Sequence, residues 1–310
     1  MRIVFFGTPD FATASLDAIV HSHHEVAAVV TVPDRQAGRG QKLIFSAVKE
    51  YALRHSLPLM QPDKLRDPGF LDRLKELHAD AFVVVAFRML PEAVWAMPPK
   101  GTFNLHASLL PRYRGAAPIN WAIINGEHET GVTTFMLNHH IDEGSILLQR
   151  STPVADNETA GSLHDRLAAM GCQLVVETLD GLETNSLCPA PQQGAPCPAP
   201  KIFKDTCRID FTATAATVER LVRGLAPYPA ATLTLRTPAG GELPFKVFRC
   251  RTTTQPSPAP KHIECDGKKV LKIAANDYFV EILELQMAGK KRNNIEDFLR
   301  GNNLSGCKLV

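Results

Sequence analysis

Short apolar runs alternate with amphipathic stretches along the first half of the chain. The continuously apolar run Ala81–Phe87 (AFVVVAF) is typical of a strand buried on both faces of a parallel sheet. Further runs predict strands at Arg2–Gly7, Val26–Val32, Leu57–Met60 and Thr130–Leu137. Stretches with helical spacing predict helices at Phe45–His55, Pro68–His78 and Thr159–Thr184. Strands that alternate with helices indicate an α/β fold with a doubly wound, mostly parallel sheet.

The second half of the chain has a different pattern. Ser186–Lys201 (SLCPAPQQGAPCPAPK) is rich in proline, has no period, and is interpreted as an extended connector. Short strand-like runs follow at Thr232–Leu235, Phe245–Arg249, Val270–Ile273 and Tyr278–Leu285. These runs predict a smaller all-β domain, for which an open barrel of the oligonucleotide-binding type fits. We therefore expect a catalytic domain over 1–185, a linker over 186–206 and a basic β-barrel over 207–310.

Composition places the chain among ordinary soluble proteins. It has 310 residues, 45% of them apolar and 21% charged, which suits about two domains. The seven cysteines form no C-x-x-C pair or zinc-binding spacing, so we expect free thiols in a reducing compartment. No apolar run approaches the ~20 residues needed to span a bilayer. Because the first strand starts at Arg2, a signal peptide is not expected, and the predicted location is the cytoplasm.

The net charge of +2 conceals an asymmetry between the two halves. Residues 1–185 hold 16 Lys and Arg against 21 Asp and Glu, a balance of −5, whereas residues 186–310 hold 18 against 11, a balance of +7. Such a split favours a polyanionic partner for the second half. Ordinary surface charge is the alternative, and the charge balance alone does not separate the two.

A row of polar residues interrupts the apolar pattern at Gly101–Gly115 (GTFNLHASLLPRYRG). Strand side chains alternate between faces, so Asn104, His106 and Ser108 share one face. Such a row is costly to bury unless its members bond to each other or to a ligand. The run turns at Pro111 and leads into a predicted helix at 118–126, which indicates a site at the carboxyl end of the sheet. The simpler alternative is a hydrogen-bonded core histidine beside an asparagine that caps a loop.

Two loops carry further candidates. Pro33–Leu43 (PDRQAGRGQKL) holds Arg35, Arg39 and Lys42 between glycines, and it lacks the spacing of a phosphate-binding loop. It is either an exposed solvated loop or a basic loop that reaches a phosphate backbone.

Gly7 alone stands where a dinucleotide site would have three glycines, so such a site is not expected.

The other loop follows the strand at 130–137 and contains Asp142, which is placed to reach the strand that carries His106. The neighbouring His139 and His140 are adjacent, and adjacent residues of an extended chain point to opposite faces, so we expect no metal there.

The chain resembles the folate-dependent formyltransferases in three segments. They are RIVFFGTPDFA at the start, NLHASLLPRYRGAAPINWAIINGEHETGVT in the centre, and IDEGSILLQ after it. Within the family the resemblance is strongest to the members that formylate a tRNA-bound amino acid. It implies an enzyme that transfers a formyl group from 10-formyltetrahydrofolate to the amine of initiator methionyl-tRNA, needs no metal and acts as a monomer.

The resemblance also assigns roles to residues. Asn104, His106 and Asp142 match the catalytic positions, and Ser108, Leu109, Leu110 and Pro111 match the folate-binding segment. The A-G-R-G loop matches one that contacts the acceptor end of the tRNA, with Arg39 as the main side chain and Arg35 and Lys42 beside it. His106 is expected to move the proton, since imidazole titrates near neutral pH. Asn104 is expected to donate to the oxyanion, and Asp142 to hold the imidazole.

The sequence departs from the family pattern at Arg88, where glycine is common, and at Ser145, where an acidic residue is common. The folate contacts are therefore expected to differ near Arg88. Two alternatives stay open. A nucleotide-sugar formyltransferase or a formyltetrahydrofolate hydrolase would usually have proline in place of Ala107 and would lack the A-G-R-G loop. An RNA-binding protein without activity would have lost the catalytic residues.

Overall fold

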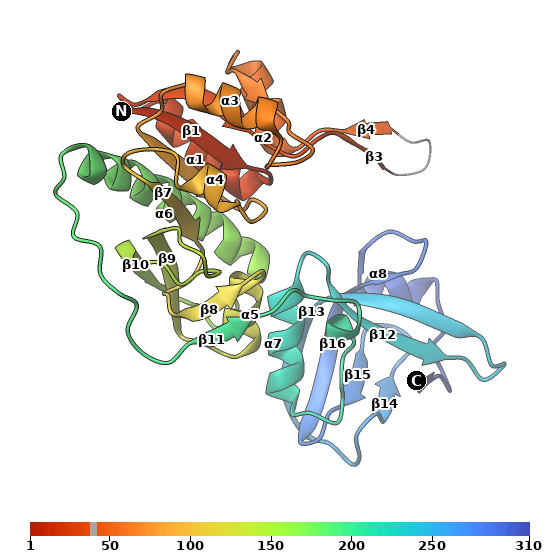
Figure 1. The fold of residues 1–310 in the computed structure, drawn as a ribbon. Coiled ribbons are helices and arrows are strands. Elements are labelled where there is room, and N and C mark those ends of the chain that lie inside the picture. The colour runs from red at the N-terminus through yellow and green to blue at the C-terminus, as the bar shows by residue number, and fades with distance from the viewer. Residues whose placement is uncertain (38–41) are drawn as a thin grey trace. The chain divides into compact units, whose positions relative to one another are not determined.

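The first half of the chain folds around a seven-stranded sheet with the order β10-β9-β7-β6-β1-β2-β5 (Figure 1). The structure is a computed structural model that describes residues 1–37 and 42–310. The parallel strands are β1 (Arg2–Gly7), β2 (Glu25–Val30), β5 (Leu59–Met60), β6 (Ala81–Val85) and β7 (Thr102–His106). Two antiparallel strands complete one edge, β9 (Glu129–Met136) and β10 (Ile146–Pro153). The predicted doubly wound, mostly parallel sheet is thereby confirmed.

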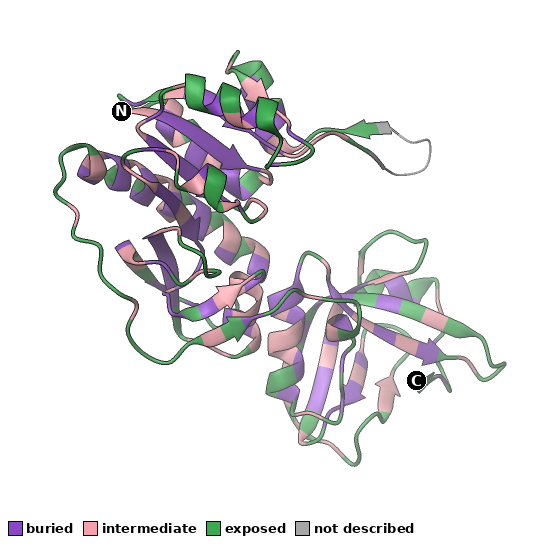
Figure 2. Ribbon diagram, viewed as in Figure 1, coloured by how far each residue is buried: buried purple, intermediate pink, exposed green. Residues whose placement is uncertain are grey.

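The central strands are buried on both faces, which explains their continuous apolar pattern. Phe5, Phe6, Phe82 and Phe103 are almost completely inaccessible to solvent, and Figure 2 shows β1 buried along its length. The helices that accompany this sheet are α1 (Asp10–Val20), α2 (Ala47–Arg54), α3 (Pro68–Glu76), α4 (Glu92–Trp95) and α6 (Ala160–Glu183). No helix within the described ranges is long and apolar enough to cross a membrane.

Local sequence signals define where two of these helices begin. The Ser46 hydroxyl accepts a hydrogen bond from the Lys49 amide at 3.0 Å and caps α2. The Asp67 carboxylate accepts from the Phe70 amide at 2.9 Å and caps α3, with Pro68 in the first turn.

Shorter elements lie at the ends of the parallel strands. β3 (Arg35–Ala37) and β4 (Lys42–Ile44) pair as a hairpin within the segment that was predicted to be a loop. β8 (Arg112–Gly115) follows β7 and pairs in parallel with β11 (Cys197–Ala199). Part of the predicted connector is thus hydrogen-bonded to the polypeptide that follows the polar row.

The second half forms an antiparallel sheet with the order β14-β15-β16-β13-β12-β18 and β17 paired to β16. Its strands are β12 (Ala231–Arg236), β13 (Glu242–Pro256), β14 (Ile263–Cys265), β15 (Leu271–Ala274), β16 (Tyr278–Met287), β17 (Asn293–Asn294) and β18 (Lys308–Leu309). This barrel-like sheet confirms the predicted fold class. The sequence did not predict helices α7 (Ala215–Leu225) and α8 (Ile295–Arg300), whose apolar residues complete its core.

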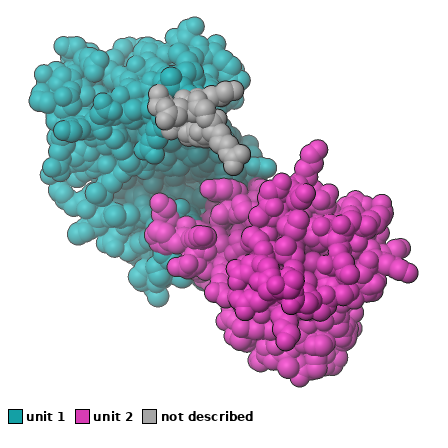
Figure 3. All heavy atoms as spheres, turned by 90° about the vertical axis from the view of Figure 1, so that its right-hand side faces the viewer, with its two compact units in different colours: residues 1–118, 129–153, 164–200 teal, residues 119–128, 154–163, 201–310 magenta. Residues whose placement is uncertain are grey.

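The chain divides into two compact units, coloured separately in Figure 3. Unit 1 comprises residues 1–118, 129–153 and 164–200, and unit 2 comprises residues 119–128, 154–163 and 201–310. Helix α5 (Pro118–Ile124) and the first turn of α6 contribute to unit 2 although they precede residue 185. Asn120 on α5 donates to the Gly224 carbonyl of α7 at 2.7 Å within that unit.

Candidate active site

Strand β7 presents Asn104 and His106 on one face, as the alternation predicted. Asn104 lies between Val84 of β6 and Phe135 of β9, and His106 lies opposite Thr133. The intervening Leu105 points to the other face, where it contacts Gly171 of α6 so closely that a Cβ on that glycine would lie 2.7 Å from Leu105 Cδ2. Helix α6 therefore covers the apolar face of β7 and leaves the polar row on the opposite face.

The geometry of His106 determines which nitrogen carries its proton. The imidazole is buried, and Nε2 lies 2.8 Å from the Tyr113 carbonyl oxygen. A carbonyl can only accept, so Nε2 donates, and in the neutral ring Nδ1 keeps its lone pair. The side-chain amide of the half-buried Asn104 forms no hydrogen bond with any residue that the structure describes.

Asp142 lies in the turn after β9 with its backbone in the left-handed region, at a φ of 55°. Its Oδ2 accepts a hydrogen bond from the Gly115 amide at 2.9 Å. No direct hydrogen bond joins Asp142 to His106 among the described residues. Instead both bond to the backbone of β8, His106 at Tyr113 and Asp142 at Gly115.

The segment before β11 anchors this turn, through a residue that the sequence did not identify. Gln192 donates to the carbonyl oxygens of Asp142 at 2.8 Å and Gly144 at 3.0 Å. Its own side-chain oxygen accepts from Nε and Nη2 of Arg114, and Nη1 of Arg114 forms an ion pair with Glu143 at 2.8 Å. Nothing in the aperiodic, proline-rich sequence around Gln192 indicates this role.

The predicted folate-binding segment forms a tightly bonded turn. The buried Ser108 hydroxyl donates to the Arg112 carbonyl at 2.6 Å, and the Thr133 hydroxyl donates to the Ser108 carbonyl at 2.6 Å. Gln149 donates to the Leu110 carbonyl at 2.9 Å. Leu110 and Pro111 are buried, whereas Leu109 is partly exposed. The Ser108 side chain is thus engaged in shaping the turn.

Arg88, the residue that departs from the family pattern, joins two strand ends. It lies just after β6 and donates to the backbone carbonyls of Pro62 and Asp63, which follow β5. Burial lowers the pKa of its guanidinium, and its buried Nε has no hydrogen-bond partner in the described part of the chain. The other departure, Ser145, uses its backbone carbonyl to accept from the Met136 amide at 2.9 Å.

Two of the three basic candidates, Arg35 and Lys42, lie on the β3–β4 hairpin. Arg35 is exposed at the start of β3, and Lys42 is the first residue of β4, where it pairs with Ala37. Arg39 lies outside the described residues. At the base of the hairpin, Asp34 accepts from Lys49 at 2.6 Å and from Gln61 at 2.8 Å, and these hydrogen bonds hold the pKa of the Asp34 carboxyl below its usual value.

His139 and His140 are both exposed in the turn after β9. His139 lies 3.7 Å from a carboxylate oxygen of Glu92. Among the described residues, neither histidine belongs to a cluster of potential metal ligands.

Comparison with known proteins gives a consistent result. The formyl transferase family matches residues 1–179, and its C-terminal domain matches residues 201–303. A methionyl-tRNA formyltransferase of Bacteroides thetaiotaomicron is 49% identical over 100% of this chain and 98% of its own. One from Parabacteroides distasonis is 50% identical over 97% of this chain and 95% of its own.

Solved structures show the same fold. An N-formyltransferase of Helicobacter canadensis, in complex with folinic acid and dTDP-3-aminofucose, has a TM-score of 0.66 at 20% identity. It covers 91% of this chain and 98% of its own. HypX of Aquifex aeolicus, in complex with tetrahydrofolic acid, has a TM-score of 0.65 at 20% identity over 99% of this chain and 48% of its own. The sequence and fold comparisons agree, and the chain belongs to the formyl transferase family, within it to the methionyl-tRNA formyltransferases.

Proposed function

We propose that this enzyme moves the formyl group of 10-formyltetrahydrofolate to the α-amine of initiator methionyl-tRNA, and that Asn104, His106 and Asp142 carry the reaction. The observation that supports the site best is the arrangement on β7. A histidine with its tautomer set by the Tyr113 carbonyl stands two residues from an asparagine whose amide has no partner among the described residues. The identity to full-length methionyl-tRNA formyltransferases supports the acceptor.

In the proposed reaction the amine nitrogen attacks the formyl carbon, and the carbonyl electrons move onto its oxygen. When that tetrahedral intermediate collapses, the bond from carbon to N10 of the folate breaks. The amine loses a proton and N10 gains one, so no net proton is released. His106 Nδ1, which keeps its lone pair because Nε2 donates to Tyr113, accepts the first proton and returns it to N10.

Asn104 and Asp142 stabilise the charges that develop. The Asn104 amide donates to the oxyanion, and loss of such a donor costs about 3–4 kcal/mol in the transition state. Asp142 supplies a negative charge for the protonated amine and imidazole. Its position depends on the Gly115 amide and on Gln192, since both hold the turn in which it lies.

The donor is proposed to be a reduced folate bound beside the Ser108–Pro111 turn. Tetrahydrofolic acid and folinic acid are the ligands named for HypX and for the Helicobacter enzyme. In this chain the Ser108 hydroxyl is occupied by the Arg112 carbonyl, so Ser108 contributes through the shape of the turn. The partly exposed Leu109 is the proposed contact with the donor, and the buried Leu110 and Pro111 shape the turn beside it.

The tRNA is proposed to bind through two sets of basic residues, with the enzyme acting as a monomer. The first set is Arg35 and Lys42 on the hairpin together with Arg39, which lies outside the described residues. The second set is in the basic domain over 207–310, where exposed lysines stand on the turns beside β14, β15 and β16, namely Lys268, Lys269, Lys290 and Lys291. Phosphate contacts of this kind produce binding that weakens steeply with salt.

A formylation assay tests the proposal. Purified enzyme with 10-formyltetrahydrofolate and charged initiator methionyl-tRNA should produce formylmethionyl-tRNA, and His106→Ala should lose almost all of that activity. The same reaction with a dTDP-linked amino sugar tests the small-acceptor alternative. Formylation of the sugar without formylation of the tRNA would overturn the proposed acceptor.

A further inference from the structure

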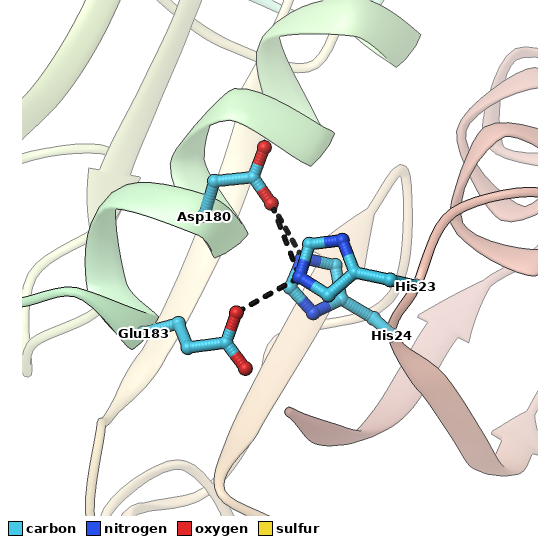
Figure 4. A group of neighbouring side chains, drawn as sticks. All are labelled: His23, His24, Asp180 and Glu183. Atoms are coloured by element: carbon cyan, nitrogen blue, oxygen red, sulfur yellow. Dashed lines mark hydrogen bonds and ion pairs between the residues drawn. The ribbon is translucent and has the colours of Figure 1, made fainter.

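A second polar cluster lies where the parallel strands of the unit 1 sheet begin, at the opposite end of the strands from the candidate active site. His23 and His24 occupy the bend between α1 and β2, just before the amino end of β2, and Asp180 and Glu183 lie on the last turns of α6. Figure 4 shows the two imidazoles side by side with both carboxylates directed at them. Because β1, β2, β6 and β7 are parallel, their amino ends lie together at one side of the sheet. His106 lies at the carboxyl end of β7, on the other side.

The four side chains bring their ligand atoms close together. One atom from each residue lies within 4.8 Å of all the others. His24 Nε2 is 2.9 Å from Asp180 Oδ1, and His23 Nε2 is 3.7 Å from that oxygen and 2.8 Å from Glu183 Oε2. Ligands about 2.0–2.2 Å from a tetrahedral metal are about 3.3–3.6 Å apart. Two of the observed separations are shorter than this range and one is longer, so one ion would be reached by small movements of the exposed side chains of His23, Asp180 and Glu183.

The surroundings hold His24 in place. Its side chain is completely buried, whereas the other three side chains of the cluster are accessible to solvent. The Met1 ammonium donates to the other ring nitrogen of His24, Nδ1, at 3.0 Å. A metal at Nε2 would therefore displace the proton on that nitrogen, and a proton of the Met1 ammonium would move to Nδ1.

We propose that His23, His24, Asp180 and Glu183 bind one divalent transition-metal ion, of the class that includes Zn²⁺ and Co²⁺. Two imidazole nitrogens and two carboxylate oxygens suit a borderline-soft ion in tetrahedral coordination, whereas Mg²⁺ and Ca²⁺ prefer oxygen ligands alone. Access is open, because the side chains of His23, Asp180 and Glu183 are 61%, 49% and 39% exposed. Within the described residues this is the only cluster of its kind.

The ion would connect two parts of unit 1 that are distant in sequence. His24 and Asp180 are 156 residues apart, so a shared ion joins the end of α6 to the sheet edge. The site lies at the opposite edge from Asn104 and His106, so its role is structural. Bound metal should raise the thermal stability of the enzyme and leave formyl transfer unchanged.

The experiment measures metal binding by the full-length enzyme after treatment with a chelator. Co²⁺ serves as the first probe, because its absorption spectrum distinguishes nitrogen and oxygen ligands from the seven free thiols. Zn²⁺ then competes with Co²⁺ to give its affinity. The variants are His23→Ala and Asp180→Asn, both at exposed positions that should preserve the fold. The control is the double variant His139→Ala/His140→Ala, which removes another adjacent histidine pair.

One equivalent of Co²⁺ should bind without thiolate-to-metal absorption bands and should raise the Tm. Each site variant should weaken Zn²⁺ binding by about 10-fold or more, by comparison with the 10–100-fold cost of losing even an outer partner of a metal ligand. The control should bind like the unmodified enzyme. Equal affinity in the site variants, thiolate bands, or no binding at millimolar metal would overturn the proposal and leave a hydrogen-bonded contact between α6 and β2.

Discussion

The side chain of Gln192 donates a hydrogen bond to the backbone carbonyl of Asp142 at 2.8 Å, across 50 residues of sequence. Gln192 belongs to the proline-rich stretch, and Asp142 to the turn after β9. The same amide nitrogen reaches the Gly144 carbonyl at 3.0 Å. The position of the proposed catalytic carboxylate is therefore set partly by a segment whose composition suggests only a connector.

Replacement of Gln192 by alanine should reduce kcat while the protein stays folded. The change removes the two hydrogen bonds from Gln192 and leaves the Asp142 carboxylate held by the Gly115 amide alone, so its position becomes less fixed. A misplaced catalytic group can cost about 100-fold in rate. Steady-state formylation kinetics measure the loss. Gln193→Ala is the matched control, because Gln193 is exposed and adjacent. If both variants had the same kcat, Gln192 would have no positioning role.

Asn104→Ala and His106→Ala should each abolish most turnover. Loss of an oxyanion donor should lower kcat by about 10²–10³, and loss of the proton carrier by about 10²–10⁴. The affinity for the folate donor should change little, since both groups act mainly in the transition state. Single-turnover kinetics and donor binding are the measurements. His140→Ala controls for loss of an exposed imidazole, and near-normal turnover by His106→Ala would exclude the proposed proton transfer.

Gly144→Ala should disrupt the turn that carries Asp142. A Cβ at this position would overlap the carbonyl oxygen of Met136, so the turn or β9 must shift. We expect a loss of about 1–3 kcal/mol in unfolding free energy, as for other overpacked sites, together with reduced activity. Gly69→Ala on α3 is the control, since its nearest neighbour, Asp67 Oδ1, would lie 3.4 Å from the new Cβ. Equal denaturation midpoints for the two variants would contradict the expected overlap.

The Asp34 carboxylate should make stability at the hairpin base depend on pH. Hydrogen bonds from Lys49 and then Gln61 lower the pKa of Asp34 below its ordinary value of 3.8. The contribution is therefore present above that value and is lost as the pH falls through the lower pKa of the folded state. The protection of Lys49 and its neighbours against hydrogen exchange, relative to the intrinsic exchange rate, should fall below about pH 4. Asp34→Asn should weaken this dependence, and Asp72→Asn on α3 is the control; an unchanged profile in Asp34→Asn would assign the effect elsewhere.

Arg39→Ala should weaken productive binding of tRNA and leave folate binding intact. Each lost phosphate contact should reduce the slope of log affinity against log salt by about 0.7–0.9. Binding of initiator tRNA across a salt series measures that slope. Arg73→Ala, on α3, is the control for loss of one positive charge. An unchanged slope and unchanged activity would place Arg39 among ordinary solvated residues.

The residues that could be predicted from the sequence are those set by local periodicity. The faces of β7 follow from strand alternation, so Asn104 and His106 were placed together correctly. The hydrogen-bond partner of the Asp142 side chain could not be predicted. The group that this side chain contacts depends on the left-handed backbone of Asp142, at φ 55°, and on the position of Gly115. Gly115 itself has a φ of +124°, and a Cβ at this position would lie 2.5 Å from the Ala199 carbonyl oxygen of β11, so only glycine fits.

Contacts between distant segments account for the other features that were missed. Helix α7 has apolar residues at helical spacing, but the surrounding strand runs favoured an all-β interpretation. The close approach of the adjacent His23 and His24 side chains was not predicted either. The rule that adjacent side chains diverge applies to extended strands, whereas these two lie in a bend with ring centroids 4.0 Å apart.

The interleaving of unit 2 has a consequence for synthesis on the ribosome. Asn120 leaves the ribosome 104 residues before Gly224, the residue whose carbonyl its side chain contacts. At about 5–20 residues per second, that interval lasts roughly 5–20 s. Gly161, whose amide donates to the Ala226 carbonyl at 3.0 Å, has a shorter delay of the same kind. Until α7 has been translated, Asn120 and Gly161 in the nascent chain therefore lack the carbonyl groups to which they donate in the folded protein.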